Sequence, residues 1–288
     1  MRAVSSRNEK NNINPRSEVL EFMIALENIS KSYRKNIFGN QRTDIVKDVT
    51  FNIQKGETLG LIGASGCGKT TLAKIATRLM KPTTGQIEFD GNDITAVSET
   101  EMRKMRQQIQ IMFQNPESAL NPRIKIYDSI AEIMRIHKIH KKNTADEKRK
   151  VKELIDIVGL QEEHLLRYPG ELSGGQVQRA VLARVLSVEP KFIVADEPTS
   201  MLDVSVQAQI LKILKDAQKE YQFACLFISH NIGVVKAVSD RIAIMNEGMI
   251  LEEGEVNSII DAPKTEFGKA LMDNYYADFY VELDRVAN

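Results

Sequence analysis

Eight residues in the first quarter of the chain have the composition of a phosphate-binding loop. The segment 63–70 reads Gly-Ala-Ser-Gly-Cys-Gly-Lys-Thr, which matches the pattern G-x-x-x-x-G-K-[ST]. Its glycines let successive backbone N–H groups point at phosphate oxygens, and the helix that follows adds its positive N-terminal end. Lys69 is expected to reach the terminal phosphates, and the Thr70 hydroxyl is expected to bind Mg²⁺. The residues predicted to bind a nucleotide here are Gly63, Ala64, Ser65, Gly66, Cys67, Gly68, Lys69, Thr70 and Thr71.

A second segment places two carboxylates at the end of an apolar run. The stretch 192–195, Phe-Ile-Val-Ala, is followed directly by Asp196 and Glu197. Such a run predicts a buried parallel strand, and open α/β sheets bind ligands at the carboxyl ends of their strands. Asp196 is therefore predicted to hold Mg²⁺, directly or through water, and Glu197 to polarise an attacking water as general base. An Asp-Glu pair is common, so this prediction depends on the phosphate loop beside it.

A third segment, 172–176, reads Leu-Ser-Gly-Gly-Gln and precedes a predicted helix. A Ser-Gly-Gly turn at a helix N-terminus is another anion-binding arrangement. Because a single ATP does not need two such cradles, the simplest explanation is that this turn serves an ATP held by a partner chain. A turn that only caps its own helix is the alternative. The residues concerned are Ser173, Gly174, Gly175 and Gln176.

The elements that must position these segments follow an α/β order. Alternation of apolar and polar residues predicts antiparallel strands with one solvated face near 24–29, 49–53 and 87–89. Short buried strands are predicted at 57–62, 192–195 and 225–228, and a hairpin at 242–251. Helices are predicted at 69–80, ending before Pro82, and from a capping Asp203 to about 220. Residues 115–187 are predicted to be mostly helical, with Gly159 as a C-terminal cap.

The composition narrows the class of protein. The 288 residues hold 39 Lys and Arg and 39 Asp and Glu, whereas a nucleic-acid-binding protein usually has a basic surplus. Cys67 and Cys225 match no metal-ligand spacing and are expected to be reduced thiols. No segment approaches the roughly 18 apolar residues of a membrane-spanning helix, and the polar N-terminus does not look like a secretory signal. If the protein acts at a membrane, we expect another chain to supply the spans.

Together the three segments resemble the Walker A, Walker B and signature motifs of the ATP-binding-cassette (ABC) family. The resemblance covers residues 22–275, between an expected disordered tail at 1–21 and a C-terminal tail at 276–288. It implies a P-loop NTPase fold, with a RecA-like core, an antiparallel β subdomain and a helical insert at about 115–187. It also implies head-to-tail dimers that hold two Mg-ATP at their interface.

Four further positions match this family one at a time. Tyr33 resembles the aromatic residue that stacks on adenine, although a plain strand-end tyrosine is the alternative. Gln114 resembles the Q-loop glutamine, which touches Mg²⁺ and senses the membrane partner. Asp203 resembles the D-loop aspartate that crosses the dimer interface, and His230 the switch histidine that contacts the γ-phosphate. The resemblance thus implies Glu197, His230 and Lys69 as catalytic residues, and as Mg²⁺ ligands Thr70, Gln114 and Asp196.

A narrower resemblance links 115–123 and 196–210 to importers of dipeptides, oligopeptides and nickel. The Asn-Pro-Arg ending at Arg123 is most like the second of the two ATPase subunits that such importers carry. Asn231, Met201 and Val177 depart from the usual residues but remove no catalytic group. With no cysteine after Cys225, we expect no iron–sulfur cluster.

This resemblance also implies partners and a location. The expected partners are a second ABC ATPase subunit, different or identical, and integral membrane permeases, with an extracytoplasmic substrate-binding protein indirectly and no nucleic acid. The expected place is the cytoplasmic face of the membrane. Peptides are the favoured solute, and nickel also fits. A soluble mechanochemical ABC ATPase is the rival interpretation, but the single cassette and the importer-like segments argue against it.

Overall fold

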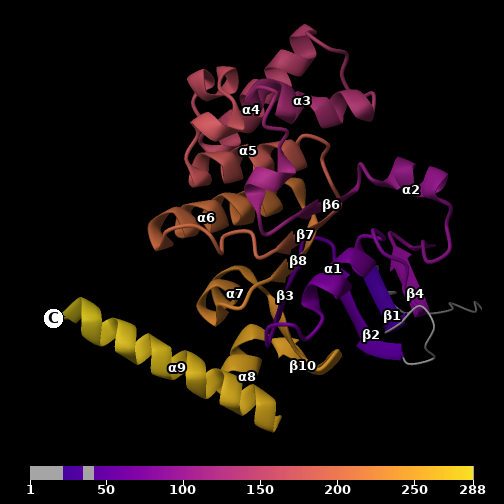
Figure 1. Cartoon of the computed structure of the whole chain (residues 1–288), viewed down its shortest axis with the longest axis vertical. Helices are drawn as coiled ribbons and strands as arrows, with labels where there is room; N and C mark the ends of the chain where they lie inside the picture. Colours follow the sequence, from indigo (N-terminus) through magenta and orange to yellow (C-terminus); the bar gives the residue numbers. More distant parts are fainter. Residues whose placement is uncertain (1–21, 35–41, 288) are drawn as a thin grey trace, which may run out of the picture.

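The computed structural model describes residues 22–34 and 42–287, which form two β-sheets covered by helices (Figure 1). The N-terminal tail expected at 1–21 lies outside the described residues. The fold is the predicted α/β arrangement, with an antiparallel sheet beside a largely parallel one.

The first sheet has four strands in the order β2-β1-β4-β5. Its strands are β1 (Phe22–Arg34), β2 (Arg42–Gln54), β4 (Thr84–Phe89) and β5 (Asn92–Asp93). All its pairings are antiparallel, which confirms the alternation seen in the sequence. On β4, for example, Ile87 and Phe89 are buried while Glu88 between them is exposed, because successive side chains point to opposite faces.

The second sheet has six strands in the order β10-β9-β3-β8-β7-β6. They are β3 (Thr58–Gly63), β6 (Ile109–Met112), β7 (Phe192–Asp196), β8 (Ala224–Ile228), β9 (Arg241–Asn246) and β10 (Met249–Glu255). The pairings from β6 to β9 are parallel, and β9 and β10 form the predicted antiparallel hairpin. Strands β3, β7 and β8 are buried along their whole length, as continuous apolar runs predict.

The second sheet is sandwiched between two apolar layers. Leu61 packs with α1 (Lys69–Ala76) and the antiparallel sheet, whereas its neighbour Ile62 packs with the helices on the other face. Those helices include α5 (Gly174–Leu186), α6 (Val204–Tyr221), α7 (Ile232–Val238) and α8 (Val256–Asp261). Because the strands are parallel, their carboxyl ends meet at one edge of this sheet, where the phosphate loop also lies.

Between β6 and β7 the chain is helical. This part holds α3 (Ile126–Ile136), α4 (Ala145–Val158) and α5, with short 3₁₀ turns at Pro116–Ala119, Glu162–Leu166 and Pro169–Glu171. Figure 1 shows α3 and α4 at the top, above α5 and α6. On α4 the predicted apolar face is fully buried, and Gly159 ends the helix with φ 67°, as predicted.

One predicted helix boundary was wrong. The helix expected over 69–80 ends at Ala76, because the Thr77 hydroxyl bonds back to the Ala73 carbonyl and Arg78 turns to φ 52°. At the other end of the chain, α9 runs over Glu266–Ala287 and includes most of the segment 276–288 that was expected to be a C-terminal tail. A further helix, α2 (Glu99–Met105), follows the antiparallel sheet and begins with a capping box on Ser98.

A buried carboxylate joins α3 to α4. Glu147 is fully buried, and it accepts hydrogen bonds from Arg135 at 2.6 and 2.8 Å and from the Tyr127 hydroxyl at 3.0 Å. The Asn143 N–H donates to the same carboxylate. These bonds, chiefly those of Arg135, lower the pKa of Glu147 from 4.5 to about 2. The ion pair therefore fixes the packing of the helical part.

We predict that Glu147→Gln lowers the free energy of unfolding by about 3 kcal/mol at neutral pH, because Arg135 loses its buried countercharge. The pKa of Glu147 is lower in the folded state, so this contribution is complete above pH 4.5 and is lost as the pH falls toward 2. Urea unfolding of both proteins at several pH values measures the difference. Asp146→Asn is the control, because its ion pair with Arg149 is exposed. A difference that does not shrink below pH 4.5 would contradict the prediction.

Candidate functional site

The phosphate loop joins the end of β3 to the start of α1, as predicted. Steric contacts explain why glycine is required at particular positions of this loop. A Cβ on Gly63 would lie 1.9 Å from the Met245 carbonyl oxygen, and one on Gly68 would lie 2.7 Å from that of Ile45. Gly66 has φ 77°, and a Cβ added there would meet nothing within 4 Å, so it faces open space. The loop therefore packs tightly on one side and leaves a concave backbone surface on the other.

Lys69, the first residue of α1, bends back over this loop. Its Nζ donates to the carbonyls of Gly63 at 2.8 Å and Ala64 at 2.9 Å, and the residue is buried. Within the described part of the chain this ammonium forms no direct ion pair, although its positive charge acts on the nearby Asp196 carboxylate. Cys67 lies behind the loop as a buried free thiol, with Sγ 3.8 Å from Nζ. A buried cation without a carboxylate partner favours an anionic ligand at this position.

The two carboxylates at the end of β7 have different surroundings. Asp196 is buried, which raises its pKa, while a hydrogen bond from the Thr70 hydroxyl acts in the opposite direction. Glu197 is only half-buried and takes a left-handed backbone conformation with φ 49°. Its N–H donates to the Ile228 carbonyl of β8 at 2.9 Å, so the turn after β7 remains attached to the neighbouring strand.

The ends of three adjacent parallel strands bring three predicted residues together. Gln114 follows β6, Glu197 follows β7 and His230 follows β8. The Gln114 Nε2 donates to Glu197 Oε2 at 2.8 Å, and His230 Nδ1 lies 3.2 Å from Glu197 Oε1. Glu197 is therefore placed between an amide donor and an imidazole, which orient its carboxylate at the mouth of the pocket.

These residues line one open pocket of about 460 Å³. It contains six of the nine phosphate-loop residues predicted to bind a nucleotide, and also Ile45 of β2, for which the sequence carries no signal. Only the register of the antiparallel sheet beside the loop brings Ile45 here. The lining residues are Ile45, Ser65, Gly66, Gly68, Lys69, Thr70, Thr71, Gln114, Asp196, Glu197 and His230.

The donor set of this pocket fits Mg²⁺. Thr70, Asp196 and Gln114 offer a hydroxyl, a carboxylate and an amide oxygen, which are the hard oxygen ligands that Mg²⁺ prefers. Among the described residues, no group of three or more His, Cys, Asp or Glu side chains could hold a metal by itself. An ion bound by one carboxylate together with phosphate oxygens agrees with both observations.

Several residues predicted for the site lie outside this pocket. Tyr33 is 41% exposed, its hydroxyl lies 3.0 Å from Met80 Sδ, and its ring lies 5.6 Å from Lys31 Nζ. It does not line the pocket, so the predicted adenine contact has no counterpart in the contacts of this single chain. Asp203 stands at the N-cap of α6, but its side chain makes no capping bond, contrary to our prediction, and it remains exposed.

The Ser-Gly-Gly turn forms a separate surface. Ser173 caps α5, and it exchanges hydrogen bonds with Gln176 at 2.9 and 3.4 Å. The amide of Gln176 also lies 3.2 Å from the buried ring of His164. Helix capping, the alternative from the sequence, is thus present, and Ser173 and Gly174 are nevertheless exposed. A turn that is ordered, exposed and outside the pocket is available to a ligand from outside this chain.

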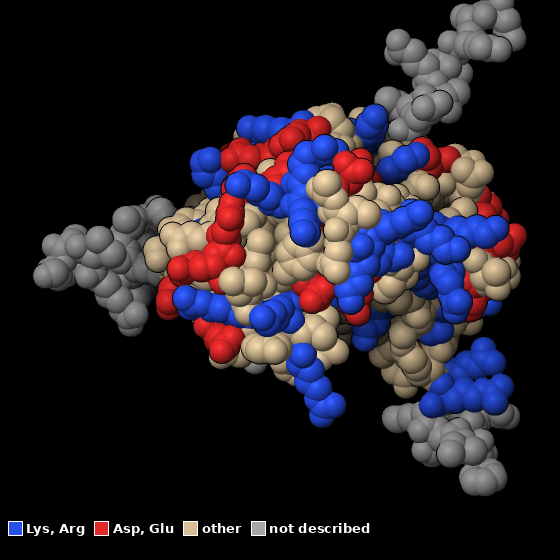
Figure 2. Space-filling model, turned by 90° about the horizontal axis from the view of Figure 1, so that it is seen from above, with Lys and Arg blue, Asp and Glu red and all other residues tan. Residues whose placement is uncertain are grey.

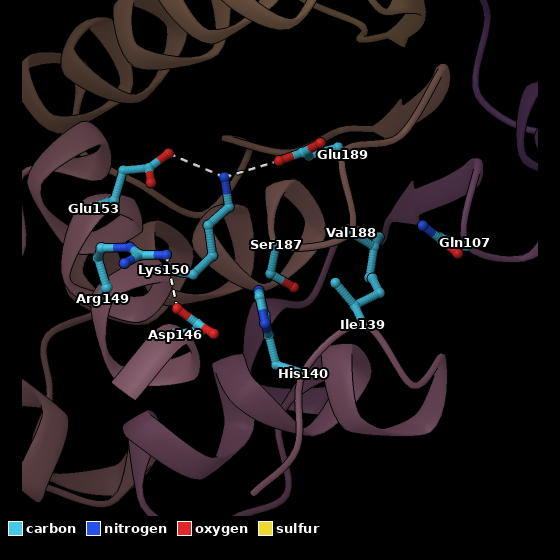
Figure 3. A pocket seen from close by; sticks show the side chains of 10 residues that line it. All are labelled: Gln107, Ile139, His140, Asp146, Arg149, Lys150, Glu153, Ser187, Val188 and Glu189. Atoms are coloured by element: carbon cyan, nitrogen blue, oxygen red, sulfur yellow. Dashed lines mark hydrogen bonds and ion pairs between the residues drawn. The ribbon is translucent and has the colours of Figure 1, made fainter. Parts of the chain in front are cut away.

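Two other cavities lie toward the opposite, amino ends of the strands. One of about 270 Å³ lies between α4 and the loop before β7, where Lys150 bridges Glu153 and Glu189 (Figure 3). A wider cleft of about 1090 Å³ separates the antiparallel sheet from the start of β7 and the end of α6. The charged groups that line the first cavity largely pair with one another. Their ion pairs connect α4 to the loop before β7.

The surface has no uniform charge. Seen from above, Lys and Arg gather on one side of the face in Figure 2, while Asp and Glu are interspersed among them elsewhere. Within residues 22–34 and 42–287, no helix has both the length and the apolar character needed to cross a bilayer.

Comparison with known proteins agrees with this geometry. Residues 46–200 match the family model described as ABC transporter. The chain is 41% identical to the oligopeptide transport ATP-binding protein OppF of Streptococcus mutans, over 87% of this chain and 80% of that one. It is 38% identical to the di/tripeptide transport ATP-binding protein DppF of Pseudomonas aeruginosa, over 88% and 79% of the two chains.

Solved structures give the same result. The dimeric structure of an ATP-binding cassette, MJ0796, bound to ADP and phosphate has a TM-score of 0.73 and 28% identity, and the match covers 81% of this chain and 99% of that chain. The cassette cbiO1 from Clostridium perfringens gives the same TM-score and identity, over 84% and 92%. The fold and the pocket thus define an ATP-hydrolysing cassette. The chain belongs to the ABC transporter family, in the group of oligopeptide and dipeptide transport ATP-binding proteins.

Two glycine substitutions should separate folding from binding in the phosphate loop. Gly63→Ala forces its Cβ onto the Met245 carbonyl, so we expect a large fall in melting temperature. Gly66→Ala has no steric neighbour, so it should cost only about 1 kcal/mol for the left-handed backbone. Its Cβ occupies the cradle, however, and ATP binding should weaken at least about 10-fold. Thermal unfolding and equilibrium ATP binding measure the two effects, and unchanged ATP affinity in Gly66→Ala would contradict this view of the loop.

Proposed function

We propose that this protein is the ATP-hydrolysing subunit of a membrane importer and couples Mg-ATP hydrolysis to the uptake of oligopeptides or dipeptides. The observation that carries the proposal is the convergence of Gln114 and His230 on the Glu197 carboxylate beside the phosphate loop. The named relatives that transport oligopeptides and di/tripeptides support the choice of solute.

The proposed chemistry divides the pocket residues by role. The loop N–H groups and Lys69 bind the β- and γ-phosphates, for which Lys69 exchanges its bonds to the Gly63 and Ala64 carbonyls. Bound Mg²⁺ supplies charge neutralisation, and Thr70, Asp196 and Gln114 are the residues that would hold it. Glu197 accepts a proton from the attacking water, and His230 orients that carboxylate and donates toward the γ-phosphate.

The proposed assembly has two cassettes. Ser173 and Gly174 are exposed and lie outside the pocket of their own chain, so we assign them to the ATP of an opposing cassette. Asp203, also exposed and without a capping bond, is assigned to the same interface. The resemblance of 115–123 to second ATPase subunits favours a different, paired partner chain. Tyr33 is assigned to the adenine ring, which it can stack on from the carboxyl end of β1.

The proposed docking site for the membrane permeases is the segment 115–123, between Gln114 and α3. Asn121, Pro122 and Arg123 are exposed there, and Gln114 at its start contacts Glu197 directly. A permease that moves this segment therefore acts on the hydrolytic carboxylate through one side chain. The chain would then lie on the cytoplasmic face of the membrane, with its partners supplying the spans.

We predict that Glu197→Gln retains ATP binding within about 2-fold but lowers hydrolysis by about 100-fold or more, because the general base is lost. Equilibrium ATP binding and steady-state phosphate release on the purified chain measure the two effects. Glu266→Gln, at a side chain that is 99% exposed, is the matched control and should leave both unchanged. Turnover near wild type in Glu197→Gln would remove this carboxylate from the mechanism.

The solute is tested by uptake in cells that carry Glu197→Gln in place of the wild-type chain. Labelled oligopeptide and nickel are followed side by side, and we expect the loss of peptide uptake alone. Loss of nickel uptake alone would assign the transporter to nickel instead. If neither changes while hydrolysis is abolished, the protein is an ABC ATPase with a different role, such as a soluble mechanochemical one.

A further inference from the structure

The two residues after Glu197 are held by amide side chains from two different helices. Gln178 of α5 donates from Nε2 to the Pro198 carbonyl at 2.6 Å. Gln207 of α6 donates from Nε2 to the Thr199 hydroxyl at 2.8 Å. Pro198 and Thr199 are both buried. The turn that carries Glu197 is therefore fixed on one side by β8, through its N–H bond to Ile228, and on the other by α5 and α6.

Gln178 is a costly residue for this structural role. Its side chain is completely buried, and its Oε1 meets no donor anywhere in the described part of the chain. A buried acceptor without a donor destabilises the fold, and native structures keep such groups where they serve another purpose. An apolar side chain of the same length would remove this unsatisfied oxygen but would leave the buried Pro198 carbonyl without its donor. The amide is thus retained for its bond to Pro198 rather than for packing.

The same face of α5 carries the signature turn. Gly174 and Gly175 are four and three residues before Gln178, so all three lie on one side of the helix. A Cβ on Gly175 would lie 2.5 Å from the Val206 side chain of α6, so α5 approaches this helix as closely as a glycine allows. Because the two helices are in such close contact, a displacement of the exposed end of α5 also displaces the segment 198–206.

We propose that Gln178 is a positioning residue that couples the signature turn to the hydrolytic carboxylate Glu197 of the same chain. The inference rests on the proposed function, in which the signature turn contacts the ATP of the opposing cassette. When that ATP engages Ser173 and Gly174, α5 shifts as a rigid element, and the Gln178–Pro198 bond passes the shift to the peptide one residue from Glu197. ATP bound at one site then changes the position of the general base at the other site.

The geometry of Glu197 makes it responsive to such a shift. Its backbone is in the left-handed region, at φ 49°, where a side chain other than glycine or a small polar residue is strained. Its carboxylate must keep two contacts at once, with Gln114 at 2.8 Å and His230 at 3.2 Å. A small movement of the Pro198 carbonyl changes both distances, and catalysis is sensitive to displacements of this size.

The test is Gln178→Met in the full-length chain. Methionine has a similar length, cannot donate to the Pro198 carbonyl and carries no Oε1 acceptor, so one unsatisfied oxygen is exchanged for another. We expect the melting temperature to stay within about 3 °C of wild type. ATP binding to the chain's own pocket should stay within about 2-fold, whereas kcat should fall about 10-fold or more. The Hill coefficient for ATP should fall toward 1, because the two sites lose their coupling.

Gln218→Met is the matched control. Gln218 is also buried, donates to the Phe223 carbonyl at 3.3 Å and accepts from the Thr58 hydroxyl at 3.0 Å, at the amino ends of the strands. Its loss orphans a buried hydroxyl far from the pocket, so the melting temperature should fall by more than in Gln178→Met. The kcat and the Hill coefficient should stay at wild-type values. The proposal therefore predicts opposite patterns for the two variants: Gln178→Met loses activity and keeps its stability, whereas Gln218→Met loses stability and keeps its activity.

Two results would overturn the proposal. One is a wild-type kcat and Hill coefficient in Gln178→Met, and the other is a loss of kcat that only follows a loss of melting temperature, as a packing residue would give. Glu197→Gln is measured in parallel. If that variant also hydrolyses ATP normally, the proposed function itself has failed; if it does not while Gln178→Met is normal, only the coupling has failed.

Discussion

The parallel pairing of β6, β7, β8 and β3 governs the arrangement of the whole site. Parallel strands end at the same edge of a sheet, so residues far apart in the sequence become neighbours. Glu197 meets Gln114 from one adjacent strand and His230 from the other. The phosphate loop leaves β3 along this same edge, so binding and hydrolysis are placed in one pocket.

Tight backbone contacts fix the positions of the residues at this edge of the sheet. The loop can follow its path only because Gly63 and Gly68 lack side chains that would strike neighbouring carbonyl oxygens. Glu197 accepts a left-handed backbone because the Ile228 carbonyl holds its N–H. These strained and close-packed positions lie where the ligand is expected, while the apolar strands behind them are regular and fully buried.

The helical part is cross-linked internally and is bonded to the segment that follows Glu197. Glu147 and Arg135 lock α3 to α4, and Lys150 ties α4 to Glu189 before β7. At its other border, α5 starts at an exposed turn and is bonded internally to the segment after Glu197. Gln114 lies at the start of this helical part, directly after β6, and the signature turn lies at the start of α5 within it.

Local sequence patterns were enough to predict the α/β fold, most element types and the residues of the phosphate loop. Alternation, apolar runs and glycine spacing act over a few residues, and they predicted the strands around the site except β6, which is short and has only two of its four residues buried. One helix end was predicted wrongly: α1 ends at Ala76, where the Thr77 hydroxyl bonds back to the Ala73 carbonyl. Motif resemblance, rather than local pattern, drew attention to Gln114, Asp203 and His230.

Which of these side chains meet is a property of the tertiary structure. The contacts of Glu197 with Gln114 and His230, the presence of Ile45 in the pocket and the bond from Gln178 to Pro198 all join distant segments. They depend on strand order, register and helix packing, which no short window of sequence encodes. The position of Tyr33 outside the pocket is likewise a property of the tertiary structure. Local patterns establish what each segment becomes, and packing establishes what it touches.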